Sequence, residues 1–278
     1  MIATLWGVSF QNPVLLAAGT AGFGRELDRM VDLDVLGGIV TKAVTPEARR
    51  GHPGPRVAEF RGGMLNAVGL ANPGVEEVLV HDLPWLTGRL RHARVLVNVA
   101  GARMEDYVLV LERLREIGGV TAFEINASCP NTSAGGLEFG ADDRSLAELV
   151  RRCRNATTRP LVVKLSPILP DIARSAQAAA DAGADGLSLV NTMPGTLAGR
   201  LGNGFGGMSG PALLPVGVLA VRKVRSRVAL PIIGVGGVRR AEDVREYLEA
   251  GADLVAIGTA GLADPRLPER IARGFARG

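Results

Sequence analysis

Lysine is nearly absent from this chain of 278 residues. Only Lys42, Lys164 and Lys223 stand beside 29 arginines (32 Lys+Arg minus 3). Lysine carries its charge on one compact ammonium group, whereas arginine spreads it over a planar fork. Because Lys42 and Lys164 each end a predicted strand, we interpret these two as functional cations.

Cysteine is equally scarce, since Cys129 and Cys153 are the only two. They cannot make a disulfide framework or supply the ligands of a zinc or iron–sulfur site. So few cysteines fit a reducing compartment, and the N-terminus lacks the basic region of a signal peptide. We therefore expect a cytoplasmic protein with no metal site of its own.

Long apolar runs and charge blocks are missing as well. No stretch reaches about 18 uninterrupted apolar residues, so no membrane span is expected. The net charge of +4 comes from dispersed arginines, a pattern that does not favour nucleic-acid binding. The chain shows no linker, its hydrophobic share is 47%, and it has 37 glycines. These features predict a single domain over residues 1–278, with many tight turns.

Short apolar runs alternate with amphipathic patterns along most of the chain. Continuous apolar runs are typical of strands that are buried on both faces. The expected strands are 13–17, 38–42, 95–99, 122–126, 161–165, 186–191, 231–234 and 254–258. The expected helices are 26–32, 104–117, 145–156, 172–182, 215–227, 241–250 and a last one that ends near 276. This alternation predicts a (β/α)8 TIM barrel, with a small hairpin at 4–10 that plugs its bottom.

Three predicted loops, 43–74, 127–144 and 192–214, are much longer than usual, and all three follow strands. Long loops after barrel strands gather at one face, where such barrels carry their chemistry. The residues at the strand ends are mostly glycines, amides, ammonium groups and one thiol, with almost no carboxylates. This set is a poor metal site and suits a flat, polar, anionic heterocycle. The glycine-rich segments 234–237 and 258–259 follow strands seven and eight, the usual phosphate position in these barrels.

Cys129 is the candidate catalytic residue. It lies three residues beyond the strand that ends at Asn126, at the head of a Pro/Gly-rich loop. A thiol in such a place suits proton transfer or nucleophilic attack, although burial as a packing residue is the alternative reading. None of the three histidines ends a strand, so Cys129 is the candidate base. Cys153 falls on a predicted helix, and we interpret it as a packing residue.

Lys164 ends the strand after the one that leads to Cys129. The other strand ends offer its ammonium no obvious carboxylate partner. Burying an unpaired ammonium is unfavourable, so we expect an anion to meet it there. The negative charge that develops on a reduced flavin ring is the anion we expect. For the same reason, we expect an anion to meet the ammonium of Lys42 at the end of the second strand.

Several segments together resemble one family. They are 41–45 (TKAVT), 63–74 (GMLNAVGLANPG), 98–101 (NVAG), 124–131 (EINASCPN), 163–167 (VKLSP), 190–192 (VNT), 208–213 (MSGPAL), 234–237 (GVGG) and 258–260 (GTA). In this order they resemble the class 1 dihydroorotate dehydrogenases, in particular the type B catalytic subunit. The resemblance covers about residues 5–264. Cysteine at 129 resembles class 1, and Asn191-Thr192 with residues 64–68 resembles type B.

The resemblance implies that FMN binds at the barrel mouth and that Cys129 removes a proton from dihydroorotate while the flavin accepts a hydride. The FMN contacts it implies are Ala18, Lys42, Ala43, Asn98, Asn126, Lys164, Val190, Gly210, Gly236, Gly237, Gly258 and Thr259. The substrate contacts it implies are Lys42, Asn66, Ala67, Val68, Gly69, Leu70, Asn126, Asn191 and Thr192. Ala18 is a departure, because the family often has serine there.

The resemblance also implies partners. Type B catalytic subunits form homodimers, and they pass electrons to NAD through a second subunit that carries FAD and a [2Fe–2S] cluster, in a heterotetramer. This chain has too few cysteines for such a cluster, and no Gly-x-Gly-x-x-Gly element follows a strand. We therefore expect the relay in a separate iron–sulfur subunit.

Four alternatives stay open from the sequence. The first is a type A-like enzyme that acts alone on fumarate. The second is a dihydrouridine synthase, for whose added tRNA-binding domain the chain has no room. The third is a flavin-free, phosphate-binding barrel lyase or isomerase. The last is an arginine-rich binding protein without activity, which explains neither Cys129 nor the two strand-end lysines.

Overall fold

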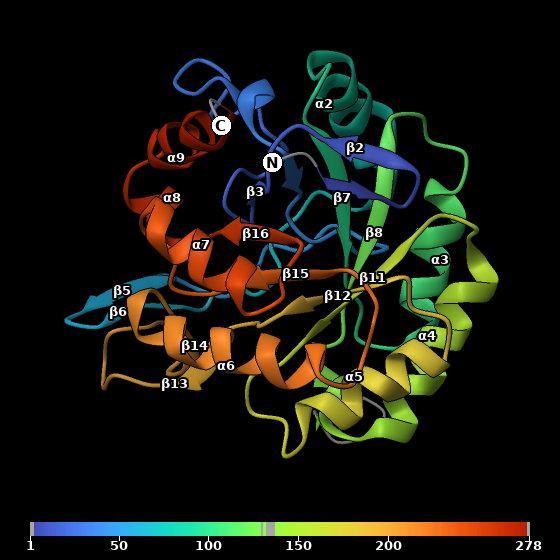
Figure 1. Cartoon of the computed structure of the whole chain (residues 1–278). Helices are drawn as coiled ribbons and strands as arrows, with labels where there is room; N and C mark the ends of the chain where they lie inside the picture. The colour runs from blue at the N-terminus through green and yellow to red at the C-terminus, as the bar shows by residue number, and fades with distance from the viewer. Residues whose placement is uncertain (1–2, 129, 132–136, 277–278) are drawn as a thin grey trace.

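Eight short parallel strands close into a barrel in the computed structural model, which describes residues 3–128, 130–131 and 137–276 (Figure 1). Around the barrel the strands follow the order β11-β12-β15-β16-β3-β4-β7-β8. They are β3 (Val14–Leu16), β4 (Gly38–Val40), β7 (Arg94–Val99), β8 (Val120–Asn126), β11 (Leu161–Leu165), β12 (Gly186–Leu189), β15 (Ile232–Val235) and β16 (Leu254–Ile257). The predicted (β/α)8 barrel is therefore confirmed.

Helices follow most barrel strands and cover the outside of the barrel (Figure 1). The longer ones are α3 (Met104–Leu114), α4 (Asp143–Ala156), α5 (Ile172–Asp181), α6 (Leu214–Arg225), α7 (Ala241–Glu249) and α9 (Leu267–Ala276). The shorter ones are η1 (Leu33–Val35), η4 (Phe139–Ala141), η5 (Pro211–Leu213) and α8 (Thr259–Ala263).

One predicted helix is absent, and one helical stretch was not predicted. The segment 26–32 forms successive turns, because its backbone mixes i→i+3 and i→i+4 hydrogen bonds that start at Gly24. The sequence pattern also missed a helical stretch before β7. It consists of α1 (Val75–Glu77), one wider π turn at η2 (Val78–Asp82) and α2 (Leu83–Arg89). Pro84 follows directly after this wider turn, at the start of α2.

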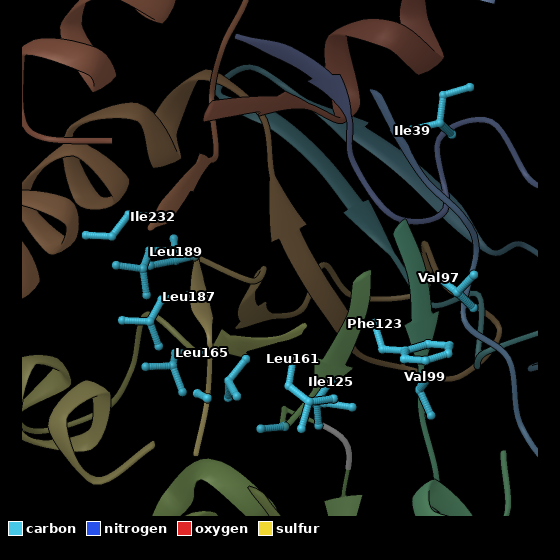
Figure 2. Close-up of a cluster of buried hydrophobic side chains, with 14 of the residues drawn as sticks. Ile39, Val97, Val99, Phe123, Ile125, Leu161, Leu165, Leu187, Leu189 and Ile232 are labelled. Atoms are coloured by element: carbon cyan, nitrogen blue, oxygen red, sulfur yellow. The ribbon is translucent and has the colours of Figure 1, made fainter. Parts of the chain in front are cut away.

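The barrel strands bury side chains on both faces. Outward-facing residues such as Ile39, Phe123 and Leu187 join the large cluster between strands and helices (Figure 2). A second cluster fills the barrel interior and includes Leu15, Val40, Leu96, Val162 and Leu254. Because neighbouring residues in a strand face opposite ways, the short apolar runs supply both clusters.

A small hairpin closes the bottom of the barrel, as the sequence predicts. β1 (Ala3–Leu5) pairs with β2 (Val8–Phe10) in antiparallel fashion. Trp6 packs against the inner cluster and donates from Nε1 to the carbonyl oxygen of Asp185 at 2.8 Å. Position 186 must be glycine for this plug, because a Cβ there would lie 2.8 Å from the Trp6 ring.

Two of the three long loops join in an antiparallel sheet that the sequence did not predict. Its order is β13-β14-β6-β5, and it extends beside the barrel (Figure 1). The strands are β5 (Val57–Phe60), β6 (Gly63–Asn66), β13 (Met193–Gly195) and β14 (Gly206–Ser209). The third long loop contains the short pair β9 (Pro130–Asn131) and β10 (Leu137–Glu138). Within the described ranges, no helix has the length and apolarity that crossing a bilayer requires.

Two similar clasps hold the lower ends of neighbouring strands. Asp185 accepts from Arg154 at 2.6 Å and from the backbone N–H of Leu161 at 2.8 Å. Asp253 repeats this arrangement with Arg225 at 2.7 Å and the N–H of Ile232 at 2.8 Å. Each carboxylate therefore ties the helix before a strand to the first residues of that strand.

Replacing Asp253 by alanine should lower the free energy of unfolding by about 1–3 kcal/mol, because it leaves Nη2 of Arg225 and the N–H of Ile232 without their acceptor. Unfolding in urea measures this change. The control is Glu116→Ala, which breaks an ion pair whose carboxylate side chain is 90% exposed and should change the free energy by less than about 0.5 kcal/mol. Equal losses for the two variants would contradict a structural role for the clasp.

Candidate functional site

Four buried polar side chains lie toward the carboxyl ends of adjacent barrel strands. Asn98 on β7 and Glu124 on β8 are each 1% exposed, Lys164 on β11 is 6% exposed and Ser188 on β12 is fully buried. The strand register pairs Asn98 with Glu124, and Lys164 with Ser188. In three of these strands, the polar residue comes two positions after a residue of the inner cluster, which is Leu96, Ala122 or Val162. The apolar interior therefore gives way to a polar floor at the barrel mouth.

Glu124 is the anionic member of this floor. Its Oε1 accepts from the Asn98 amide at 2.6 Å and lies 3.6 Å from the ammonium nitrogen of Lys164. The expectation that Lys164 has no carboxylate partner at the strand ends was therefore wrong. Glu124 lies inside the strand, two residues before Asn126, and strand alternation turns it to the same face as Asn126. That alternation is the signal in the sequence that could have revealed it.

Two asparagines from different strand ends meet beside the polar floor. Asn191 donates from Nδ2 to Oδ1 of Asn126 at 3.2 Å, and its own Oδ1 accepts from the N–H of Thr192. Asn126 is the register partner of Lys164. The structure thus brings the predicted residues Asn126, Lys164, Asn191 and Thr192 together.

Lys42 follows β4 and is half-buried. Its backbone is fixed, because its N–H donates to Gly22 and its carbonyl accepts from the Thr41 hydroxyl. Among the described residues, no ion pair or hydrogen bond engages its ammonium group. This cation is therefore free to meet an anionic ligand.

The predicted substrate loop begins at the antiparallel sheet. Asn66 donates from Nδ2 to the carbonyl oxygen of Gly207 at 3.1 Å. Thr192 lies against the same glycine, since a Cβ at Gly207 would come within 2.1 Å of its hydroxyl oxygen. Ala67 is buried, whereas Val68 is 38% exposed. Gly69 has a φ of 72° and packs against His52, so only glycine fits there without strain.

Asn72 holds this loop in place and was not predicted as a site residue. It is 7% exposed, and its Nδ2 donates to the carbonyl oxygen of Leu70 at 2.8 Å. Nδ2 also donates to the hydroxyl oxygen of Thr45, and Oδ1 accepts from the backbone N–H of Thr45. Asn72 therefore ties the loop after Lys42 to the loop that carries Leu70.

Backbone groups dominate the opposite side of the mouth. Gly236 and Gly237 follow β15 with φ values of 128° and 78°, and Gly258 and Thr259 follow β16. Among the hydrogen bonds of the described residues, none uses the N–H of Gly236, Gly237 or Thr259. The Thr259 hydroxyl lies 2.8 Å from the Ser209 hydroxyl, next to Gly210.

The chain's two tyrosines both support carbonyl groups at the mouth. The buried Tyr107 donates to the carbonyl oxygen of Asn126 at 2.8 Å, and the buried Tyr247 donates to that of Gly236 at 2.9 Å. Burial raises the pKa of Tyr247, so its hydroxyl stays protonated and keeps donating. Sequence reasoning missed both residues, because each lies on a helix and reaches the site only through the fold.

The remaining predicted residues differ in their surroundings. Ala18 and Ala43 are half-buried, and Val190 is buried with its N–H bonded to Val235. Cys129 lies outside the described residues. Cys153 is fully buried, which confirms it as a packing residue, and burial raises the pKa of its thiol to about 12. Cys153 is therefore chemically inert at neutral pH.

A hollow of about 460 Å³ lies on the surface beside α9 and α2. Its lining includes Asp28, Arg89, Arg266 and Glu269. Arg89 pairs with Asp28 at 2.7 Å, and Arg266 donates to the backbone of Met30. Because its lining contains none of the predicted site residues and lies beside the outer helices, this hollow is not the candidate site.

Comparison with known protein families gives a match over nearly the whole chain. Residues 1–277 match the sequence model of the family described as dihydroorotate dehydrogenase. The chain belongs to the dihydroorotate dehydrogenase family.

Individual relatives point to one branch of this family. The chain is 48% identical to the protein named dihydroorotate dehydrogenase B (NAD(+)), catalytic subunit, of Listeria monocytogenes serotype 4a, over 93% of this chain and 86% of the relative. It is 47% identical to proteins of the same name from Geobacillus kaustophilus (93% and 84%) and Bacillus pumilus (95% and 87%). The resemblance to the type B catalytic subunit is therefore confirmed.

For this member of the dihydroorotate dehydrogenase family, Tyr247→Phe tests how the mouth is supported. The variant leaves the carbonyl of Gly236 without its donor, so the free energy of unfolding should fall by about 1–3 kcal/mol. Urea unfolding measures the loss. The matched variant Tyr107→Phe should show a loss of the same order, because Tyr107 makes an equivalent bond at Asn126. Unchanged unfolding in both variants would contradict the proposed support.

Proposed function

We propose that this chain oxidises dihydroorotate to orotate with FMN as cofactor, in the synthesis of the pyrimidine nucleotide UMP. The observation that carries the proposal is the composition of the mouth. The half-buried ammonium of Lys42, which pairs with no described residue, lies at the barrel mouth with the buried ammonium of Lys164 and the amides of three asparagines, and a glycine-rich edge lies opposite. A planar ring that bears a carboxylate, carbonyls and N–H groups needs such mixed donors and acceptors.

The glycine edge fits the phosphate of FMN. Gly236, Gly237 and Thr259 have backbone N–H groups that no described residue accepts from. A Cβ at Gly237 would come within 2.5 Å of the Leu214 backbone, so the close approach depends on glycine. Clustered backbone N–H groups of this kind bind anions. Gly210, Gly258 and the Thr259 hydroxyl complete the proposed phosphate site.

The polar floor fits the flavin ring. Oδ1 of Asn98 and the hydroxyl of Ser166 are buried and have no hydrogen-bond partner among the described residues. Buried polar atoms in proteins are nearly always bonded, so such orphans point to a polar ligand. Lys164, Asn126 and Val190 lie nearby and join the proposed contacts, with Ala18, Lys42 and Ala43 at the neighbouring strand ends. When bound, the flavin supplies a two-electron acceptor.

The asparagines grip and orient the substrate in this proposal. Asn126 and Asn191 already bond each other, so one pair of amides presents a fixed set of donors and acceptors. Asn66 and Thr192 approach from the antiparallel sheet, and the backbone of residues 67–70 completes the enclosure. Lys42 meets the substrate carboxylate with its free ammonium.

Cys129 acts as the base in this proposal. Asn126, three residues before it in the sequence, ends β8 and lies next to Asn191 and Lys164. The thiolate takes a proton from C5 of dihydroorotate. Because the base must be deprotonated, the rate should rise with pH across the neutral range.

Replacing Cys129 by alanine tests this role. The variant should keep FMN but reduce it with dihydroorotate at least about 10²-fold more slowly, because general base catalysis is lost. Stopped-flow absorbance of the flavin measures the rate. Cys153→Ala is the matched control and should react at the parental rate, since that thiol is buried and inert. A Cys129→Ala variant that reduces its flavin at the parental rate would show that another group is the base.

Electron transfer to NAD requires a partner in this proposal. The relatives' name includes the words catalytic subunit, which supports a second subunit. We propose that residues 1–278 form one barrel domain, that two chains form a homodimer in the cytoplasm, and that an iron–sulfur subunit with FAD and [2Fe–2S] completes a heterotetramer. Two cysteines are too few for the four ligands of such a cluster.

Activity of the isolated chain tests the partner. Alone, it should reduce a soluble dye with dihydroorotate but should not reduce NAD at a useful rate. Addition of the iron–sulfur subunit should restore NAD reduction. Steady fumarate reduction by the isolated protein would instead support the type A-like alternative.

A further inference from the structure

Glu124 is a buried carboxylate to which the proposed substrate and cofactor contacts give no role. Its side chain is 2% exposed, and its strand lies between the strands of Asn98 and Lys164. A carboxylate at this depth is unfavourable unless it is paired and hydrogen-bonded. One oxygen, Oε1, accepts a hydrogen bond from the Asn98 amide and forms an ion pair with the Lys164 ammonium.

The bond to Glu124 fixes which end of the Asn98 amide stays free. An ionised carboxylate can only accept, so Asn98 must turn its NH2 group toward Glu124. The distance of 2.6 Å is that of a strong, charge-assisted hydrogen bond. The amide is planar, so Oδ1 points away from the carboxylate. That oxygen is buried and has no partner among the described residues.

The same carboxylate anchors Lys164. The separation of 3.6 Å is longer than a normal hydrogen bond, so the ammonium keeps protons for another acceptor. Lys164 has no other ion pair among the described residues. The three residues therefore present one acceptor, Oδ1 of Asn98, and one cationic donor, the ammonium of Lys164. A ring edge with adjacent C=O and N–H groups, such as the pyrimidine edge of a flavin, needs this combination.

We propose that Glu124 is a positioning residue for flavin binding. It holds Asn98 with its carbonyl oxygen ready for a ring N–H, and it holds Lys164 ready for a ring oxygen. This inference rests on the proposed FMN dependence. Glu124 itself contacts neither the flavin nor the substrate and acts through its two neighbours.

Glu124→Gln is the first test. A glutamine can donate as well as accept, so the Asn98 amide loses its fixed orientation. The Kd of FMN, measured by fluorescence titration of the apoprotein, should rise at least about tenfold. The flavin's reduction potential should become more positive, because the charge of Lys164 is no longer compensated.

Glu124→Asp separates position from charge. This variant keeps the negative charge but withdraws it by one methylene group. The Kd of FMN should again rise, whereas the reduction potential should stay near the parental value. The aspartate variant also provides the Kd test if the glutamine variant does not fold.

A double-mutant cycle tests whether Glu124 acts through Asn98. In an Asn98→Ala background, Glu124→Gln should raise the Kd of FMN no further, because the group that it orients is gone. Independent, additive losses would overturn the inference. A parental Kd in both Glu124 variants, or a lower unfolding midpoint with unchanged Kd and potential, would overturn it too. Failure of the parental chain to bind FMN would instead overturn the proposed function.

Discussion

A negative charge buried in the barrel has to be compensated, and the arrangement of the mouth follows from that constraint. Glu124 lies on a strand that is covered on both faces, where water cannot solvate it. An ammonium and an amide from the two neighbouring strands compensate this charge. Asn98 and Lys164 do so, and each is left with one free polar function. The contacts that compensate the charge of Glu124 therefore also leave one acceptor and one cationic donor available to a ligand.

The rest of the fold keeps that surface in place. The hairpin around Trp6 closes the opposite end of the barrel, and apolar side chains fill the interior below the polar floor. Tyr107 and Tyr247 hold backbone carbonyls at the ends of β8 and β15 from the helices outside. Asn72 joins the two loops that carry Lys42 and Leu70. Each support is a buried, satisfied hydrogen bond, which favours one geometry of the mouth over its alternatives.

Much of the fold could be predicted from the sequence, because its signals are local. Short apolar runs marked all eight barrel strands, and the strand ends named Asn126, Lys164 and Asn191 before their contacts were known. The antiparallel sheet was not predicted, because β6 pairs with β14 across more than 140 residues and neither strand is a continuous apolar run. The helical stretch at 75–89 was not predicted, because Pro84 and a wider turn interrupt the helical spacing of its apolar residues.

The contacts of the candidate site were harder to predict than its members. Glu124 was not predicted as the partner of Lys164, because it lies inside its strand and not after the strand end. Asn72 and the two tyrosines were overlooked because their roles depend on which distant carbonyls the fold brings near. Such pairings belong to tertiary structure and leave little trace in a single sequence.

The central claim is that this mouth binds a flavin and delivers dihydroorotate to it. The most direct measurement is the absorption spectrum of the purified protein, before and after dihydroorotate is added without oxygen. The account predicts a flavin spectrum that bleaches on addition. A protein that binds no flavin, or an oxidised flavin spectrum that persists with dihydroorotate, would contradict it.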